Sequence, residues 1–92
     1  MIVLKEQAKS VEWEPSINPG IIGTTIDFEA KGTNGQVQEY IWDFGDNSPV
    51  GRGYSVTHTY SKSGSYPITL TVVYADGTQQ SKKKTYEVRD SF

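Results

Sequence analysis

Apolar and polar residues alternate with a period of two along most of the chain, which is the pattern of strands with one buried face. The alternating runs cover residues 11–14, 25–30, 39–44, 55–60, 66–74 and 85–89. No stretch shows the apolar spacing of an amphipathic helix over three turns. The pattern therefore predicts six or seven short strands and no long helix.

Clusters of Gly, Pro, Asn, Asp and Ser separate the predicted strands, as turns do. They lie at residues 18–20, 33–35, 45–49, 63–64 and 76–77. Asp76-Gly77 lies between two strand-like runs, so we expect a hairpin with a primed turn there. Short strands with one apolar face must pair those faces. At this length the usual solution is a sandwich of two antiparallel sheets.

Composition supports an all-β domain and excludes several function classes. Val, Ile and Thr account for 24 of the 92 residues, whereas Leu, Ala and Met account for 6. Zero Cys excludes a disulfide, a Cys-ligated zinc site and a Cys nucleophile. The net charge of −2 gives no support for a nucleic-acid partner. No apolar run approaches the ~18 residues of a membrane-spanning helix, so we expect no membrane insertion.

Two aromatic residues mark the predicted interior. Trp42 lies on the inward phase of its strand, where immunoglobulin-like sandwiches place a buried Trp between the sheets. With no disulfide to pack there, Ile68 and Leu70 on the long strand are expected to fill the adjoining volume. Tyr66 begins that strand after Gly64-Ser65, which indicates a tyrosine corner whose hydroxyl bonds a nearby backbone group.

Three blocks of sequence, in order, carry a family resemblance. They are Tyr-Ile-Trp-Asp-Phe-Gly-Asp at residues 40–46, Val-Thr-His-Thr-Tyr at 56–60 and Gly-Ser-Tyr at 64–66, which leads into Ile-Thr-Leu-Thr-Val at 68–72. Together they resemble the PKD domain, the polycystic kidney disease repeat. The resemblance covers roughly residues 10–90. It implies an immunoglobulin-like β-sandwich of about seven antiparallel strands in two sheets.

The resemblance also implies a role. Such domains are non-catalytic modules of cell-surface and secreted proteins, among them polycystins, archaeal surface-layer proteins, bacterial collagenases and chitinases. We therefore expect residues 1–92 to be a single domain with its core at about 10–90, excised from a larger multidomain protein. It would be a monomeric, extracellular or cell-surface module without a cofactor, which contacts a protein or polysaccharide or acts as a spacer.

The alternative is a calcium-stabilised, substrate-binding accessory module of a secreted polymer-degrading hydrolase. A catalytic domain in the parent chain would favour it. Some collagenase members bind calcium through an Asp-x-Asp-Gly loop, but the equivalent residues 32–35 read Gly-Thr-Asn-Gly and lack both carboxylates. Asp76 would match a further ligand, and one carboxylate is weak for calcium. We expect no metal site.

Two other departures from the family are Asn47, where Gly is usual, and Lys82-Lys83-Lys84.

The candidate chemical residues have structural interpretations. Asp43 and Asp46 could form an acid/base pair of the glycosidase type, but turn chemistry with Gly45, in which each carboxylate accepts backbone N–H bonds, is the preferred interpretation. His58 could belong to a triad or a metal site, with Asp43 or Asp46 as nearby partners. A partly buried His in a strand is the simpler account. We therefore expect no catalytic residue.

The candidate binding residues are exposed side chains. If Trp42 points inward, Ile41 points outward, and Thr71 and Val73 on the long strand do the same. Ile41 and Val73 would form a small apolar patch within a polar face with Thr69, Thr85 and Glu39, suited to an adjacent module or partner, although scattered exposed apolar residues are common.

Tyr54 follows Gly51-Arg52-Gly53 in an apparent loop and is the best candidate for an exposed aromatic platform, whereas Trp13 is in phase with Val11 and belongs to the core.

Lys82-Lys83-Lys84 either protects a sheet edge or forms a basic patch. Residues 1–46 carry 8 acids and 3 bases, whereas residues 47–92 carry 3 acids and 6 bases. Strands from both halves interleave in such a fold, so two oppositely charged faces need not result.

Overall fold

The computed structural model describes residues 11–31 and 36–91, and within these ranges the chain forms strands and turns but no helix. The strands are β1 (Glu12–Pro15), β2 (Gly20–Ile21), β3 (Thr25–Lys31), β4 (Val37–Asp43), β5 (Gly51–Arg52), β6 (Ser55–Thr59), β7 (Gly64–Tyr74) and β8 (Gln79–Arg89). The all-β prediction is therefore confirmed.

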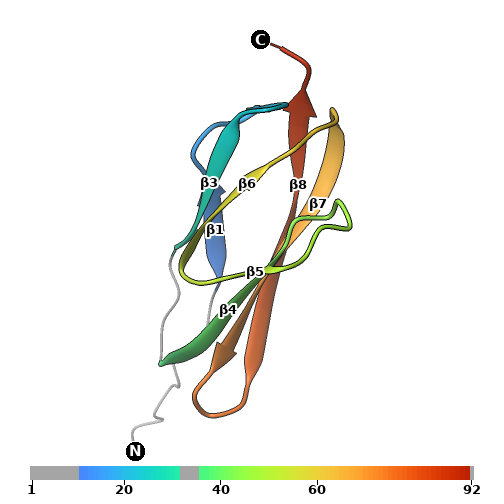
Figure 1. Ribbon diagram of the computed structural model, residues 1–92. Helices are drawn as coiled ribbons and strands as arrows, with labels where there is room; N and C mark the ends of the chain where they lie inside the picture. Colours follow the sequence, from blue (N-terminus) through green and yellow to red (C-terminus); the bar gives the residue numbers. More distant parts are fainter. Residues whose placement is uncertain (1–10, 32–35, 92) are drawn as a thin grey trace, which may run out of the picture.

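Two sheets pack face to face, as the prediction of a sandwich required. One sheet has the order β1-β3-β6, and the other has the order β2-β8-β7-β4-β5. Figure 1 shows the long β7–β8 hairpin running the length of an elongated molecule. The expectation of about seven antiparallel strands in two sheets is confirmed, with one correction: β2 pairs with β8 in parallel. Eight strands are described, two of which, β2 and β5, are only two residues long.

The period-two pattern determines which side chains are buried. On β7, residues Ile68, Leu70, Val72 and Tyr74 are buried, and the residues between them lie on the outer face. On the opposite sheet, β3 buries Ile26, Phe28 and Ala30 by the same alternation. The two buried faces meet in one core without buried charged side chains among the described residues.

Two tryptophans form the centre of this core. Trp42 on β4 and Trp13 on β1 come from opposite sheets and meet edge to face, with ring centroids 5.9 Å apart. The centroid of the Phe28 ring lies 5.9 Å from that of Trp13 and 6.1 Å from that of Trp42. Leu70 is the cross-strand partner of Trp42 on β7, so it occupies volume beside Trp42, as predicted. The facing volume is filled by Trp13 and Phe28.

Each buried indole N–H has a backbone acceptor, as a buried polar group requires. Trp42 Nε1 donates to the carbonyl of Gly53 at 2.8 Å, and Trp13 Nε1 donates to the carbonyl of Lys82 at 3.1 Å. Gly53 lies between β5 and β6, where the chain crosses from one sheet to the other. The tryptophans therefore fix the backbone at both open sides of the sandwich.

The lysine run of β8 closes the side between β1 and β8. Lys82 and Lys84 lie on the inward phase and reach Glu12 with Nζ–carboxylate distances of 3.2 and 3.3 Å. Lys84 Nζ also donates to the carbonyl of Trp13 at 2.6 Å and lies 4.7 Å from its ring centroid. Hydrogen bonds from the two lysines lower the pKa of Glu12. Lys83 points outward and remains exposed.

The β7–β8 turn differs from the prediction. The Gly77 amide donates to the carbonyl of Tyr74 at 2.9 Å, and Tyr74 N donates to the carbonyl of Thr78 at 2.8 Å. Ala75 and Asp76 have negative φ, whereas Gly77 has a φ of 89°, so the turn is not primed. A three-residue loop that ends in a left-handed glycine is the next most common hairpin connection. Asp76 Oδ1 stabilises it by accepting from the Thr78 amide at 3.0 Å.

We expect Trp42→Ala to lower the free energy of unfolding by about 3–5 kcal/mol, because it leaves a cavity between the sheets. A domain of this size has about 5–15 kcal/mol in total, so the variant should be barely stable. Urea denaturation followed by circular dichroism measures this change. Thr71→Ala, on the outer face, serves as the control and should cost less than about 1 kcal/mol. An unchanged melting temperature for Trp42→Ala would contradict the assignment of Trp42 to the core.

Candidate functional site

The loop after β4 contains the two aspartates of the sequence motif. Asp43 Oδ1 accepts a hydrogen bond from the Gly45 amide at 2.9 Å, and Asp46 Oδ1 accepts from the Ser48 amide at 3.2 Å. Both contacts span two residues, which is the geometry of an Asx turn. Gly45 has a φ of 76°, a conformation that side chains other than glycine rarely adopt. The carboxylates therefore shape the backbone of this loop.

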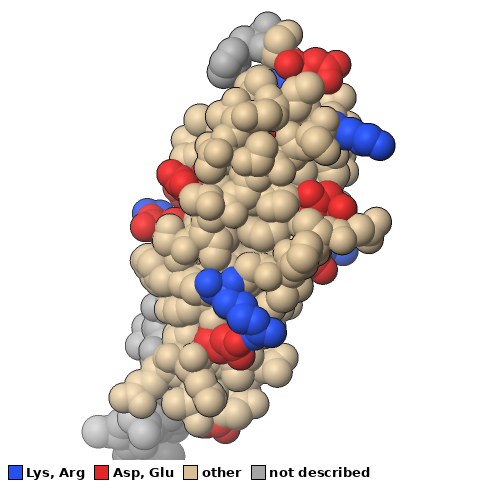
Figure 2. All heavy atoms as spheres, in the orientation of Figure 1, with Lys and Arg blue, Asp and Glu red and all other residues tan. Residues whose placement is uncertain are grey.

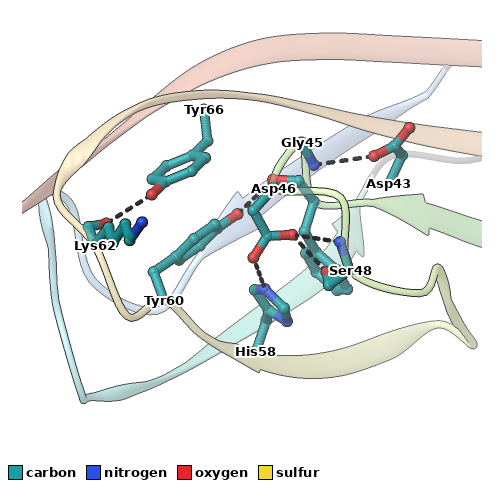
Figure 3. Close-up of polar contacts among 9 residues, drawn as sticks. Asp43, Gly45, Asp46, Ser48, His58, Tyr60, Lys62 and Tyr66 are labelled. Carbon is teal, nitrogen blue, oxygen red and sulfur yellow. Dashed lines mark hydrogen bonds and ion pairs between the residues drawn. The ribbon is translucent and has the colours of Figure 1, made fainter.

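Asp46 joins the loop to β6. Its Oδ2 lies 2.8 Å from Nε2 of His58, and its Oδ1 also accepts a bond from the Ser48 hydroxyl. The His58 ring stacks in parallel on Phe44 with centroids 4.0 Å apart. Figure 3 shows the Asp46 carboxylate between Ser48 and His58, on the side of the sandwich where the loop passes β6. Sequence reasoning named Asp46 as a possible neighbour of His58, and the structure brings the two together.

The pKa of Asp46 is lower than that of an ordinary carboxyl group. Partial burial opposes its ionisation, but the hydrogen bonds from Ser48 and from His58 favour the charged form and outweigh burial. A carboxylate that accepts several bonds is therefore held ionised in the folded chain.

Tyrosine hydroxyls hold the neighbouring backbone. Tyr60 is buried and donates to the carbonyl of Phe44 at 2.8 Å, and burial raises the pKa of its hydroxyl. Tyr66 stacks on Tyr60 at 4.3 Å and donates to the carbonyl of Lys62 at 2.7 Å. This is the contact expected of a tyrosine corner. The role of Tyr60 was not predicted, although a buried Tyr generally needs an acceptor for its hydroxyl.

The contacts of Ser48, Asp46 and His58 differ from those of a catalytic triad. A nucleophilic serine needs a base such as histidine as its hydrogen-bond partner. Here the Ser48 hydroxyl donates to the carboxylate that also binds His58, so the carboxylate lies between the two residues. In the described parts of the chain, no three His, Asp or Glu side chains gather in a way that could hold a metal. The predicted calcium-loop equivalent, residues 32–35, lies outside the described residues.

The residues predicted for the outer patch are only partly exposed. Ile41, Thr71 and Val73 are half-buried on the outer face of the five-stranded sheet. Ile41 pairs with Arg52 on one side and Thr71 on the other, and Val73 pairs with Glu39. Arg52 forms an ion pair with Glu39, so charged side chains border the patch.

One predicted neighbour of the patch is wrong. Thr85 lies opposite Pro67, near the other end of the β7–β8 ladder. The β8 residues beside Thr71 and Val73 are Ser81 and Gln79. With Thr71, these two and Gln80 line a polar hollow of about 350 Å³. The hairpin register, which the sequence did not determine, places Ser81 and Gln79 rather than Thr85 beside the patch.

Tyr54 is exposed, as expected from its glycine-flanked position. Its side chain is 48% exposed, and its ring meets that of Tyr40 edge to face at 5.5 Å. The backbone of Gly53 and Tyr54 forms hydrogen bonds with a strand of each sheet. Gly53 N donates to the carbonyl of Tyr40 at 3.1 Å, and Ala30 N donates to the carbonyl of Tyr54 at 2.9 Å.

The acidic and basic halves of the sequence meet in the fold. Ion pairs connect Glu12 with Lys82 and Lys84, and Glu39 with Arg52. Figure 2 shows acidic and basic side chains interspersed over this view rather than divided into two oppositely charged halves. Among the described residues, the structure has no helix that is long and apolar enough to cross a membrane.

Comparison with known proteins identifies the family. The family model of the PKD domain matches residues 17–89. The chain belongs to the PKD domain family. Collagenase ColA of Bacillus cereus is 38% identical over 69 residues, which is 72% of this chain and 7% of that protein. Collagenase ColA of Clostridium perfringens is 32% identical over 89 residues, which is 94% of this chain and 8% of that protein.

Solved structures agree with the fold. The PKD1 domain of the Vibrio cholerae metalloprotease PrtV superposes with a TM-score of 0.75 at 26% identity, covering 90% of this chain and 99% of that one. A structure of carbohydrate-binding modules of the β-sandwich superfamily superposes with a TM-score of 0.82 at 26% identity, covering 92% of this chain and 36% of that one. The PKD fold expected from the sequence motif is thus confirmed.

We expect Gly45→Ala to be more destabilising than Gly77→Ala. Both glycines have positive φ, where alanine costs roughly 1–2 kcal/mol. A Cβ on Gly45 would also lie 2.5 Å from the carbonyl oxygen of Pro67, whereas a Cβ on Gly77 would meet nothing within 4 Å. Thermal unfolding measures the loss of melting temperature in each variant, and the difference between the two losses reports the clash with Pro67. Equal losses would show that the loop moves away from Pro67 without cost.

We expect the stability contributed by Asp46 to disappear in acid. A carboxyl whose pKa is lowered by folding stabilises the fold above its unfolded pKa of about 4 and loses this contribution as the pH falls through the folded value. Asp46→Asn should therefore cost about 1 kcal/mol at pH 7 and progressively less below pH 4. Urea denaturation at several pH values measures this. Asp90→Asn, which removes the same charge outside the network, is the control. A cost that does not change with pH would rule out the ionised form as the stabilising partner.

Proposed function

We propose that this PKD domain is a non-catalytic module of an extracellular polymer-degrading protein, in which it contacts the polymer or a neighbouring domain. The observation that carries the proposal is the match to collagenases of which the chain spans only 7–8%. Such a small, independently folded part of a large enzyme is suited to a supporting role. The PrtV metalloprotease of Vibrio cholerae contains a similar stretch, 36% identical over 56 residues.

The chemistry of the residues in the family motif supports a non-catalytic role. Asp43 and Asp46 accept backbone hydrogen bonds, and His58 binds the same carboxylate as Ser48. These groups are therefore engaged in holding the loop, and the serine has no base. The large hollows on the described surface are open and polar, unlike the mostly apolar concave sites that bind small substrates.

The shape supports a role as a connector. The molecule measures 59 × 23 × 16 Å along its principal axes. In Figure 1, β8 runs along the long axis and ends at the top of the view. An elongated domain of this kind is suited to holding adjacent domains apart. The outer face with Ile41 and Val73 lies along the domain, where a neighbouring domain or polymer can contact it.

We expect Ile41→Lys with Val73→Lys to abolish such a contact without unfolding the domain. Both side chains point outward, so the cost in stability should be about 1 kcal/mol, whereas burying two ammonium groups in an interface costs several kcal/mol. Cross-linking mass spectrometry on the longer protein that carries the domain measures the contact.

Ser61→Lys with Ser63→Lys is the matched control, since it adds the same charge to exposed positions between β6 and β7, away from both outer faces. Cross-links that persist in the Ile41/Val73 variant would show that the outer face of the five-stranded sheet is not the interface.

A further inference from the structure

The exposed ring of Tyr54 is not explained by the packing of the domain. Tyr40 packs against the core, but Tyr54 does not belong to the core or to the side chains that pack against it. Tyr54 and Val50 are the large hydrophobic side chains that stand exposed in the described chain. Because Tyr54 is about half exposed, part of its side chain remains open to a partner. Exposed aromatic rings of this kind are characteristic of contact surfaces.

The ring is held on a rigid support. The peptide segment that carries it is bound to both sheets, through Gly53 N to the Tyr40 carbonyl, Ala30 N to the Tyr54 carbonyl, and Trp42 Nε1 to the Gly53 carbonyl. These bonds attach an exposed side chain to the centre of the core. A surface that is already ordered before binding loses less conformational entropy when a partner arrives.

Hydrogen-bond acceptors line a hollow near Tyr54. The outer face of the three-stranded sheet has a hollow of about 320 Å³, lined by Glu14, Pro15, Ser16, Asp27, Glu29, Lys31 and Ser55. Tyr54 is not part of the lining, but Ser55 follows it in the chain, and the Tyr54 hydroxyl is close enough to Lys31 to act, after Glu29, among the groups that raise the pKa of Lys31.

The charge of this hollow is negative. Lys31 is the basic residue of the lining, and it forms an ion pair with Glu29 at 2.7 Å. In residues 11–31 and 36–91, no basic side chain forms an ion pair with Glu14 or Asp27. A partner that fits must therefore supply positive charge and hydrogen-bond donors.

We propose that Tyr54 and the adjoining hollow bind an arginine side chain on an extended segment of a partner polypeptide. A guanidinium group is planar, carries five donors and no acceptor, and stacks on aromatic rings, so it matches both the ring and the carboxylates. Lysine supplies charge without the planar face. Sugar hydroxyls can donate to the carboxylates, but they carry no charge to balance them. The inference rests on the proposed contact function and names the chemistry of the partner.

The test uses the 92-residue chain and a fluorescein-labelled nonapeptide of Gly and Ser with two arginines, followed by fluorescence anisotropy. Tyr54→Ala and Asp27→Asn should each weaken binding about threefold to fivefold, and Tyr54→Phe should retain it, because the ring is kept. Replacing both arginines of the peptide by lysine should weaken binding to a similar extent. Raising the salt concentration should weaken it further.

Glu87→Gln is the matched control, because it removes the same charge from the outer face of the other sheet and should leave binding unchanged. Equal affinity of wild type and Tyr54→Ala, equal affinity for the two peptides, or no binding of either peptide would overturn the proposal. Binding of a neutral N-acetylglucosamine hexamer in place of the arginine peptide would assign the surface to a polysaccharide and overturn the proposal as well. The Ile41/Val73 experiment tests a different face, so the two proposals fail separately.

Discussion

The burial of Trp42 is the constraint on which most of this structure depends. Its ring lies between the sheets against Trp13 and Phe28, and its indole N–H holds the carbonyl of Gly53. Because side chains alternate along a strand, the inward position of Trp42 requires Ile41 and Asp43 to point outward. One buried residue thereby determines the core, the start of the aspartate loop and the backbone that carries Tyr54.

The aspartate loop shows how polar residues complete this arrangement. The chain must turn sharply after β4, and Gly45 makes the turn close to Pro67, where a Cβ would not fit. Asp43 and Asp46 satisfy amides that the turn leaves without strand partners, and His58 ties the loop to the facing sheet. The buried and turn residues of the motif that identifies the family thus serve folding. The proposed contacts use outward side chains instead, of which Ile41 belongs to the motif and Tyr54 does not.

Sequence reasoning succeeded where the pattern was local. Alternation predicted the long strand at residues 66–74 and the burial of Trp13 and Trp42, since period two follows from the geometry of a single strand. It missed β2 and β5, which are two residues long and show no period. The Gly77 turn and the neighbours of Val73 depend on register, which is set by pairing between strands. The Lys84–Trp13 contact joins residues that are 71 positions apart, and no local pattern indicates it.

The same distinction explains the surface charge. The sequence has an acidic first half and a basic second half, and the strand order decides where these charges meet. β8 lies beside β1 at the open side of the sandwich, so its lysines reach Glu12, and β5 lies beside β4, so Arg52 reaches Glu39. The three-stranded sheet combines β1 and β3 from the acidic half with β6, whose five residues include neither Lys nor Arg. Its outer face therefore keeps a negative charge that composition could not locate, and it is this face that adjoins the exposed Tyr54.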